Sequence, residues 1–551
     1  MKRRDLLKGG AAVVAGAALA GTAQSTRSAP MLVAQANSDN TLRVVRGGGF
    51  PNGLDLHAVG TNRPAYGSAW NLYDRLMTFG TKTLDDGSES YDFTVLEPEL
   101  AESWEIAEDG LSATFKLRQD ATFHDGTPVT ANDVKWSFDR AVSVGGFPTF
   151  QMKAGALESP EQFSVVDDYT FRVDFLRQDK LTMIDMAVPI PVIINSELVK
   201  QHVTEDDPWG TEWVNANDAG GGAYQLDTFK PGERLVLKRF EEWKSGPLPQ
   251  IEQIIVLDVP EAGTRRALLE RGDVDINFDV AEKDTKELRD IGDFTVISTP
   301  IENAMHTIDL NSTAELGGEP NPFFDVKVRQ AVAYAIPYEA IMSTAMFGQG
   351  VPMFGGPSFE PETIDWPQPY PYATDMEKAK ATLAESSYPD GFATTLAFNL
   401  GTQEWAEPMC VLIQEALAEL GIQVTLEKVP GANFRAVLVE KNRPMIINNF
   451  GGWLNYPDYF FFYSYHGQNA TFNGSSYQNP ELDELVDAAL QTGPGDPAYD
   501  EYVKSFLKIA FEEMPRVPMV QPSLSVAMQP NISGYQYWFH RQLDYRQLVK
   551  G

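Results

Sequence analysis

The residues that could carry out acid–base or metal chemistry are few in this chain of 551 residues. His124 and Asp125 are adjacent, and a histidine beside a carboxylate is a pairing that acid–base catalysis uses, but both fall in a predicted turn. Asp273 and Asp275 alternate, which would place two carboxylates on one side of a strand, where they could bind a cation. We interpret the first pair as part of a turn and the second as the edge of a strand.

Motifs that mark the common catalytic and nucleotide-binding sites do not occur. The chain has no G-x-S-x-G, no Walker loop and no H-E-x-x-H, and its 6 histidines are spread along the sequence. Residues 47–49 are three glycines after a predicted strand, but a proline follows where a phosphate-binding loop would enter a helix. We therefore predict no catalytic residues and no enzymatic activity. A secreted hydrolase with two opposed carboxylates, or a chaperone-like role, stays open as an alternative from another class.

The composition excludes several further classes. The chain is 43% hydrophobic and 11% aromatic, which is enough apolar material for large cores. Its formal net charge is -33, and a surface this acidic repels phosphate backbones, so we predict no nucleic-acid partner. Cys410 is the only cysteine, which rules out a disulfide within the chain and a cysteine-based metal cluster. We predict no metal and no cofactor.

Residues 1–36 have the pattern of an export signal. Arg3 and Arg4 precede an apolar run over 9–21 that is too short to span a bilayer, and Ala36 ends a small-residue cleavage site. The twin arginines with two leucines behind them resemble the twin-arginine export signal, which implies the twin-arginine translocon as a partner during export. No cysteine lies near the cleavage site, so we expect a soluble periplasmic protein without a lipid anchor.

Strands and helices alternate along the rest of the chain, which predicts an α/β fold. Period-two alternation and turn residues predict strands over 41–45, 112–117, 162–166, 170–175, 234–239, 254–259, 305–310, 394–399 and 422–427. Helical spacing predicts helices over 69–77, 130–140, 263–271, 325–336, 375–385 and 407–420. The pattern restarts after Pro300, which indicates a second α/β lobe, and ligands tend to bind in the cleft between two lobes.

A series of sequence blocks resembles the family 5 extracellular solute-binding proteins, the dipeptide and oligopeptide receptors of ABC importers. The longest block runs through residues 101–105, 109–111, 115–118, 123–130 and 133–134. Further blocks follow in the family's order at residues 71–76, 222–224, 268–275, 328–331, 334–336 and 452–453. The resemblance extends over essentially the whole mature chain.

The resemblance implies a two-lobed periplasmic-binding-protein-like fold, of the large type II class with an extra subdomain, and a hinge between the lobes. Lobe I would comprise residues 37–298, with the inserted subdomain at about 83–205, and lobe II residues 299–512. Residues 513–551 would return to lobe I. The implied partners are a small solute and the membrane permease of an ABC importer, and we expect the receptor to be a monomer.

The resemblance also implies where a ligand would bind. In peptide receptors of the family, the segment matching residues 450–455 lies along the extended ligand and offers main-chain hydrogen bonds. Those receptors place an aspartate shortly after the tryptophan to hold the peptide's α-amino group, whereas this chain has Asn455 there. Phe450 stands where some members carry an arginine for the ligand's carboxylate. Asp458 could supply the missing carboxylate.

The ligand is therefore predicted to be a short peptide or a peptide-like amine. The two departures from the family pattern leave a non-peptide solute open, such as an opine, an oligosaccharide or a chelated metal. The residues predicted to bind the ligand are Phe450, Gly452, Trp453, Asn455, Tyr456 and Asp458 on one wall and Asn62, Tyr66 and His306 on the other. The aromatic run over 459–463 is predicted to pack in the core of a lobe.

Overall fold

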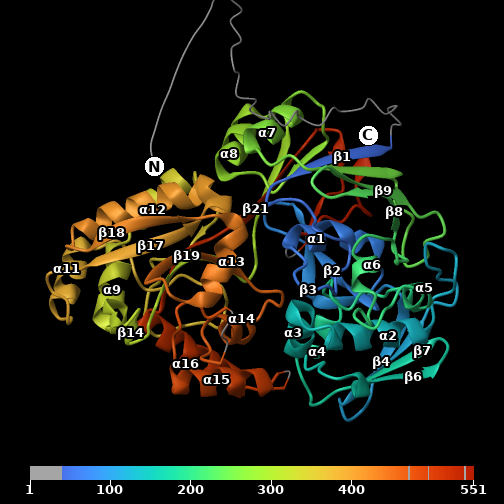
Figure 1. Cartoon of the computed structure of the whole chain (residues 1–551), viewed down its shortest axis with the longest axis horizontal. Helices are drawn as coiled ribbons and strands as arrows, with labels where there is room; N and C mark the ends of the chain where they lie inside the picture. The colour runs from blue at the N-terminus through green and yellow to red at the C-terminus, as the bar shows by residue number, and fades with distance from the viewer. Residues whose placement is uncertain (1–39, 469–471, 494, 539–540) are drawn as a thin grey trace, which may run out of the picture. The chain divides into compact units, whose positions relative to one another are not determined.

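The computed structural model describes residues 40–468, 472–493, 495–538 and 541–551 (Figure 1). The predicted export signal over residues 1–36 lies outside the described residues. The fold is mixed α/β, with two large sheets and several smaller ones. In Figure 1 the elements of the N-terminal half are blue and green, and those after residue 300 are yellow to red.

A seven-stranded sheet is built around the first strand of the chain. Its strands, in spatial order, are β12 (Thr295–Pro300), β21 (Ser523–Met528), β11 (Ile276–Phe278), β1 (Thr41–Arg46), β10 (Gln253–Leu257), β9 (Arg234–Arg239) and β8 (Tyr224–Lys230). β1 runs parallel to both of its neighbours, and its buried residues are almost continuous, as expected for a strand covered on both faces. β21 comes from the C-terminal part of the chain, so this sheet joins the two ends of the sequence.

A six-stranded sheet carries the elements after residue 300. Its spatial order is β16 (Val351–Pro352), β20 (Arg516–Gln521), β13 (Ala304–Leu310), β19 (Met445–Gly451), β17 (Ala393–Asn399) and β18 (Gln423–Val429). Helix α12 (Gln403–Ala418) packs along β17 and β18 (Figure 1). The buried residues of α12 recur at helical spacing, so one face of the helix covers the sheet.

Two smaller sheets lie in the N-terminal half. The first joins β4 (Ala101–Ile106), β5 (Ser112–Leu117), β7 (Thr170–Asp174) and β6 (Phe163–Asp167), and the second joins β2 (Met77–Thr83), β3 (Glu89–Pro98) and β23 (Gln536–Tyr537). Two further pairs of short strands are β14 (Glu315–Leu316) with β15 (Glu319–Pro320) and β22 (Ile532–Ser533) with β24 (Val549–Lys550).

The other helices are distributed over both halves of the chain. In the first half they are α1 (Arg63–Ser68), α2 (Ala131–Ser143), α3 (Gly146–Ala154), α4 (Thr182–Asp185), α5 (Ser196–Lys200), α6 (Thr211–Val214), α7 (Ala262–Glu270) and α8 (Glu282–Ile291). In the second half they are α9 (Val326–Ala335), α10 (Tyr338–Ala340), α11 (Met376–Ala384), α13 (Gly431–Glu440), α14 (Pro457–Ser464), α15 (Pro480–Gln491) and α16 (Ala498–Glu513).

The chain changes from one large sheet to the other at two places. β12 leads into β13 through residues 301–303, and β20 leads into β21 through Pro522 alone. Ile301 N donates to Pro522 O over 2.8 Å, so the two connections lie side by side. Short adjacent connections of this kind are what a hinge between two lobes requires. The exact lobe boundaries stay a prediction.

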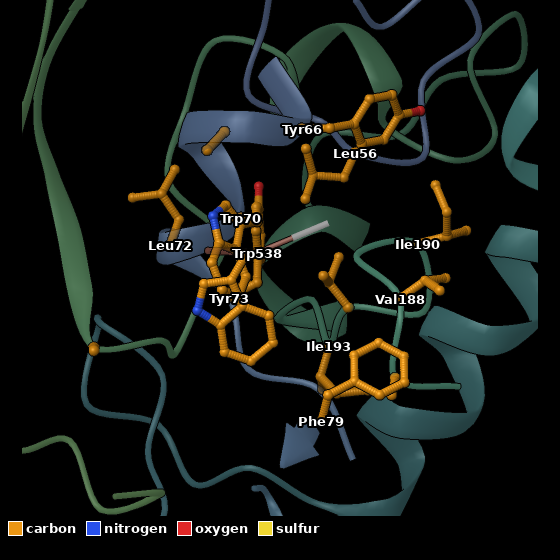
Figure 2. Close-up of a cluster of buried hydrophobic side chains, with 14 of the residues drawn as sticks. Leu56, Tyr66, Trp70, Leu72, Tyr73, Phe79, Val188, Ile190, Ile193 and Trp538 are labelled. Carbon is orange, nitrogen blue, oxygen red and sulfur yellow. The ribbon is translucent and has the colours of Figure 1, made fainter. Parts of the chain in front are cut away.

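Two large buried clusters of apolar side chains underlie these sheets. The first includes the side chains in Figure 2, where Leu56, Tyr66, Trp70, Leu72 and Tyr73 lie with the segment 188–193 and with Trp538 from near the C-terminus. The second fills the space around the six-stranded sheet and includes the buried aromatics of residues 460 and 461. Of residues 459–463, which were predicted to pack in a core, all but the partly buried Phe462 are buried, and Tyr459 and Tyr463 belong to the first cluster.

Most predicted elements coincide with observed ones, but the predicted helix over 69–77 is wrong. Asn62 Oδ1 accepts a hydrogen bond from Ala65 N at 3.0 Å and caps α1, so the helix starts earlier and ends at Ser68. A 3-10 turn follows over Ala69–Leu72, and Tyr73 is already extended. Asn71 Nδ2 donates to Leu543 O at 3.0 Å, a contact from the far end of the chain that local spacing does not encode.

Candidate functional site

The predicted ligand segment begins at the end of β19, where it pairs with β13. The register places Ala304 opposite Gly451 and His306 opposite Asn449, and cross-strand partners share one face of a sheet. Phe450 lies on the other face, because successive residues of a strand alternate. Asn449 is exposed although β19 is an interior strand of the sheet. This face of the sheet is therefore open to solvent at the end of β19.

His306 stands on that face and is buried against Trp405 of α12. The two rings stack with centroids 3.9 Å apart and an angle of 20° between their planes. Within the described residues neither ring nitrogen of His306 has a hydrogen-bond partner. Burial, and then the charge of Arg541, lowers the pKa of His306 to about 3, so its imidazole is neutral at pH 7. Sequence reasoning found His306 but missed Trp405, which is distant in the chain and carries no motif.

Two arginines that sequence reasoning also missed, Arg63 and Arg541, approach the end of β19 from the side of the seven-stranded sheet. Arg63 is the first residue of α1, and its Nη1 lies 3.9 Å from where a Cβ on Gly451 would be. Arg541 Nη1 forms an ion pair with Asp279 Oδ2 at 2.6 Å. Burial and the charge of Arg541 lower the pKa of Arg63 to about 10. The signal for Arg63 was its place in the sequence, between the predicted residues Asn62 and Tyr66.

Trp453 and Tyr66, both predicted to bind ligand, are brought together by the fold. Their rings meet edge to face with centroids 5.0 Å apart, and Phe147 lies 5.1 Å from the Trp453 ring. Trp453 is 9% exposed and belongs to the same core cluster as Tyr66. An aromatic from after β19 therefore packs into the core of the N-terminal half.

Asn62 and Gly452 already have structural roles. Asn62 caps α1, and its Nδ2 donates to Phe50 O at 2.8 Å. A Cβ on Gly452 would lie 2.6 Å from Asn303 Nδ2 and 2.7 Å from a ring carbon of Tyr459. Only glycine fits at that position, because the surrounding side chains leave no room. The close approach here is to protein side chains.

Asp458 is fully buried in an ion pair with Lys180. Its Oδ2 lies 2.7 Å from Lys180 Nζ, and Tyr499 Oη donates to its Oδ1 at 2.7 Å. Tyr456 is partly buried, with Lys180 Nζ 6.0 Å from its ring centroid. In this arrangement the charge of Asp458 neutralises a lysine of the protein, so it is not open to a ligand's ammonium group.

Phe450 and Asn455 complete the predicted set. Phe450 packs edge to face on Phe460 and Phe472, with centroids 5.1 Å and 5.6 Å away. Asn455 is partly buried, in the turn between β19 and α14. The structure thus places Phe450 in an aromatic cluster and leaves Asn455 as a partly buried neutral amide three residues before Asp458.

Side chains of α14 make a second contact with the N-terminal half. Tyr459 Oη donates to Gln151 Oε1 at 2.7 Å and accepts from Trp453 N at 3.2 Å. Tyr463 Oη donates to Phe150 O at 3.1 Å. With Lys180 and Asp458 these residues form a contact that we call the α14 seam, defined as Gln151, Lys180, Asp458, Tyr459 and Tyr463.

The sequence matches a family described as bacterial extracellular solute-binding proteins, family 5, over residues 95–472. This match covers more than half of the chain. The chain belongs to this family. Its members bind small solutes and work with ABC permeases. The matched range includes β19 and α14 but stops short of the C-terminal segment that carries Arg541.

Individual relatives are similar to this solute-binding protein over most of their length. A probable D,D-dipeptide-binding periplasmic protein, DdpA of Escherichia coli (strain K12), is 27% identical over 511 residues, which are 92% of this chain and 93% of the relative. The glutathione-binding protein GsiB of Escherichia coli O1:K1 / APEC is 27% identical over 448 residues, 79% of this chain and 82% of the relative.

Solved structures show the same two-lobed periplasmic-binding-protein fold. The binding protein DppA from Helicobacter pylori, in complex with the peptide STSA, has a TM-score of 0.76 at 21% identity, covering 93% of this chain and 98% of that one. AgaA from A.tumefacien R10, in complex with agropinic acid, has a TM-score of 0.75 at 24% identity, covering 93% and 99%. At these identities the likeness establishes the fold alone.

The titratable residues singled out first in the sequence of this solute-binding protein have partners within the protein. His124 Nδ1 lies 2.8 Å from Asp218 Oδ1, while the Asp125 carboxylate accepts from Thr127 N at 2.9 Å. Asp275 pairs with Lys550 Nζ at 2.8 Å. Among the described residues no group of side chains is arranged to hold a metal ion, and no helix there is long and apolar enough to cross a bilayer.

A cavity of about 310 Å³ lies elsewhere in the solute-binding protein, between the strands β2 and β3 and the segment 536–547. Glu99, Arg546 and Trp243 are among its lining residues. Glu99 is held there by Arg75 at 2.9 Å and Arg546 at 3.1 Å, so its charge is already compensated. None of the residues predicted to bind ligand lines this cavity.

Proposed function

We propose that this chain is the periplasmic receptor of an ABC importer and that it captures short peptides or a peptide-like solute. The observation that carries the proposal is the family match over residues 95–472. The relatives named for D,D-dipeptides and for glutathione support the peptide class, because both are similar to this chain over most of its length. The chain acts as a receptor and not as an enzyme.

The proposed mechanism is closure of the two lobes about the connections at residues 301–303 and 522. The end of β19 and the face with His306 and Asn449 form one wall. The start of α1, with Arg63 and Tyr66, forms the other. Closure buries the solute between these walls and creates the surface that the permease recognises. Export follows the twin-arginine route, and the mature receptor is a periplasmic monomer.

A thermal-unfolding panel on the full chain, purified after export, tests this function. Dipeptides, tripeptides, glutathione, opines, polyamines and oligosaccharides are compared at equal concentration. A ligand present at 100 times its dissociation constant stabilises the folded state by about 2.7 kcal/mol, which raises the unfolding midpoint measurably. We expect a raised midpoint with at least one peptide and no breakdown of that peptide by mass spectrometry. A midpoint that moves only with non-peptides would refute the peptide class, and turnover would refute the receptor role.

A further inference from the structure

Three guanidinium groups gather where α1 approaches the end of β19, and together we call them the arginine cluster (Arg46, Arg63 and Arg541). Arg46 is 5% exposed, and its Nη2 donates to the backbone O of Arg541 over 3.4 Å. The charge of Arg541 contributes to lowering the pKa of both Arg46 and Arg63, after burial, which is the larger cause for each. Like charges therefore stand close enough to one another to interact.

The carboxylates near the arginine cluster do not balance it. Asp279 pairs with Arg541 at 2.6 Å. Glu282 is a second nearby acid, and burial together with the charge of Asp279 raises its pKa to about 7, so much of it is uncharged at neutral pH. Glu404, whose charge also acts on Glu282, is exposed to solvent. Within the described residues the guanidinium of Arg63 has no ion pair and no hydrogen bond, and only burial and through-space charges act on it. Positive charge is thus in excess at this point of the structure, in a chain whose overall charge is -33.

The opposing surface offers polar groups that are also without partners. Neither ring nitrogen of His306 is hydrogen-bonded among the residues described, although the side chain is 1% exposed. Its pKa is lowered in part by Arg541, which places the imidazole within electrostatic reach of the arginine cluster. The exposed Asn449 shares its face of the sheet. Buried polar groups normally have partners, so the unpaired imidazole of His306 points to a bound group at this place.

The residues predicted to hold a ligand's ammonium group offer no unpaired negative charge. Asp458 is committed to Lys180 and Tyr499. Asn455 is a neutral amide, which supplies no counter-charge. The charges of the site therefore favour an anion over a cation.

We propose that Arg63 and Arg541 hold a carboxylate of the ligand, and that this carboxylate, not a free α-amino group, is the charged anchor of recognition. Arg63 supplies the free guanidinium, and Arg541 supplies the second. Arg541 is oriented by the ion pair with Asp279 and by the hydrogen bond that its backbone carbonyl accepts from Arg46. The neutral His306 lies on the opposing face as a further hydrogen-bonding group. The substrate class is a small carboxylic acid, including peptides whose N-terminus is blocked. This assignment rests on the proposed receptor function.

The test uses ligands that differ only in their charged ends. Calorimetric titrations on the full exported chain compare alanylalanine, its N-acetyl form, its C-terminal amide, and the form carrying both changes. Glutathione is compared with its diethyl ester, and succinate with succinamide. We expect the acids to bind whether or not the amine is acetylated, and the amides and esters to bind at least about 30-fold more weakly.

Variants locate the binding site of the carboxylate. Arg63→Gln should weaken binding of the tightest acid by about 30-fold or more, and Arg63→Lys should recover part of the loss because it restores the charge without the fork of donors. Arg271→Gln is the matched control, since Arg271 is exposed and pairs with Asp273 away from the cluster. Arg271→Gln should bind like the unmodified chain. Circular dichroism and the unfolding midpoint of each variant show whether it is folded.

The outcomes separate this assignment from the proposed function. Peptide acids and peptide amides binding equally well, or Arg63→Gln binding as the unmodified chain does, would overturn the carboxylate anchor and leave the peptide receptor standing. Binding of succinate alone, lost in Arg63→Gln, would support the anchor and refute the peptide class. If no acid of the set binds, the carboxylate assignment is wrong.

Discussion

The α14 seam and the arginine cluster are two contacts between the N-terminal half and the segments around β19, and they differ in how their charges are satisfied. In the seam, Lys180 has Asp458 at 2.7 Å, and the hydroxyl groups of Tyr459 and Tyr463 have acceptors. In the cluster, three guanidiniums face Asp279 and a Glu282 with a raised pKa. The charges of the seam are paired without a ligand. The positive charge of the cluster is balanced only when an anion binds.

This difference assigns different roles to the two contacts. A contact whose donors and acceptors are paired stabilises the arrangement of the two halves by itself. A contact with unpaired charge costs free energy until an opposite charge arrives, and that cost is recovered when the ligand binds. Removing a seam residue should therefore destabilise the protein, and removing a cluster residue should not. The predictions below test that contrast, beginning with the largest effect.

Asp458→Asn should cause the largest loss of stability. The substitution leaves the ammonium of Lys180 buried without its counter-ion, and breaking a buried ion pair from one side costs about 3–5 kcal/mol. Urea unfolding followed by tryptophan fluorescence measures the change. Asp390→Asn is the control, because Asp390 is exposed and makes no ion pair among the described residues. Adding Lys180→Met to Asp458→Asn should recover most of the loss. A single variant as stable as the Asp390→Asn control would contradict the role given to the seam.

Acid should destabilise the fold through His306, whose pKa is lowered by burial and in part by Arg541 of the cluster. The folded-state pKa of His306 is about 3 and the unfolded value is about 6.5, so the unfolded chain binds a proton first as the pH falls. Stability is therefore full above pH 6.5 and declines between pH 6.5 and 3, by about 2–3 kcal/mol at pH 4.5 from this group alone. His306→Gln should lose less stability than the unmodified chain over that range, as measured by urea unfolding at each pH.

His57 offers the matched control for that pH effect. Its pKa is also lowered to about 3, by burial and by Arg140, but it lies in the N-terminal core, where its Nε2 contacts Ile190 O at 2.5 Å. His57→Gln should remove a similar part of the acid sensitivity without altering ligand binding. Equal pH slopes for His306→Gln and the unmodified chain would show that the imidazole of His306 does not remain neutral in the fold.

Most of the elements predicted from local sequence patterns coincide with observed ones, because the side chains that define them are neighbours in the chain, but others, such as β19 and α14, were not predicted. β5 and β9 have the predicted bounds, 112–117 and 234–239, since alternation and flanking turns fix a strand's ends. The predicted helix over 69–77 failed because Asn62 caps an earlier helix and because Asn71 is held by Leu543 O from the far end of the chain. Family resemblance pointed to residues 450–455, which include the end of β19 and Trp453, but the groups that face them depend on how distant segments come together.

The arginine cluster shows where sequence reasoning ends. Arg46 follows the first strand, Arg63 opens α1 and Arg541 lies near the C-terminus, so no spacing rule connects them. Their proximity depends on β21, which returns the end of the chain to the seven-stranded sheet beside β11. Trp405 likewise reaches His306 only because α12 packs against the six-stranded sheet. Such residues are found from tertiary structure, and their charge imbalance then indicates function.

Arg63→Gln should have the smallest effect on stability and the opposite sign from the seam variant. Burial and Arg541 lower the pKa of Arg63 to about 10 from 12.5, so at neutral pH the folded protein carries a charge that is less favourable there than in the unfolded chain. Because the guanidinium is partly exposed, we expect removal of the charge to stabilise the ligand-free protein by only about 1 kcal/mol. Urea unfolding at pH 7 without ligand measures this, with Arg271→Gln as the exposed control. Saturating acid should reverse the order, making the unmodified chain the more stable one, because only its cluster can bind the anion at both guanidiniums. A destabilised ligand-free Arg63→Gln would mean that Arg63 has a partner within the protein and that the two contacts are alike.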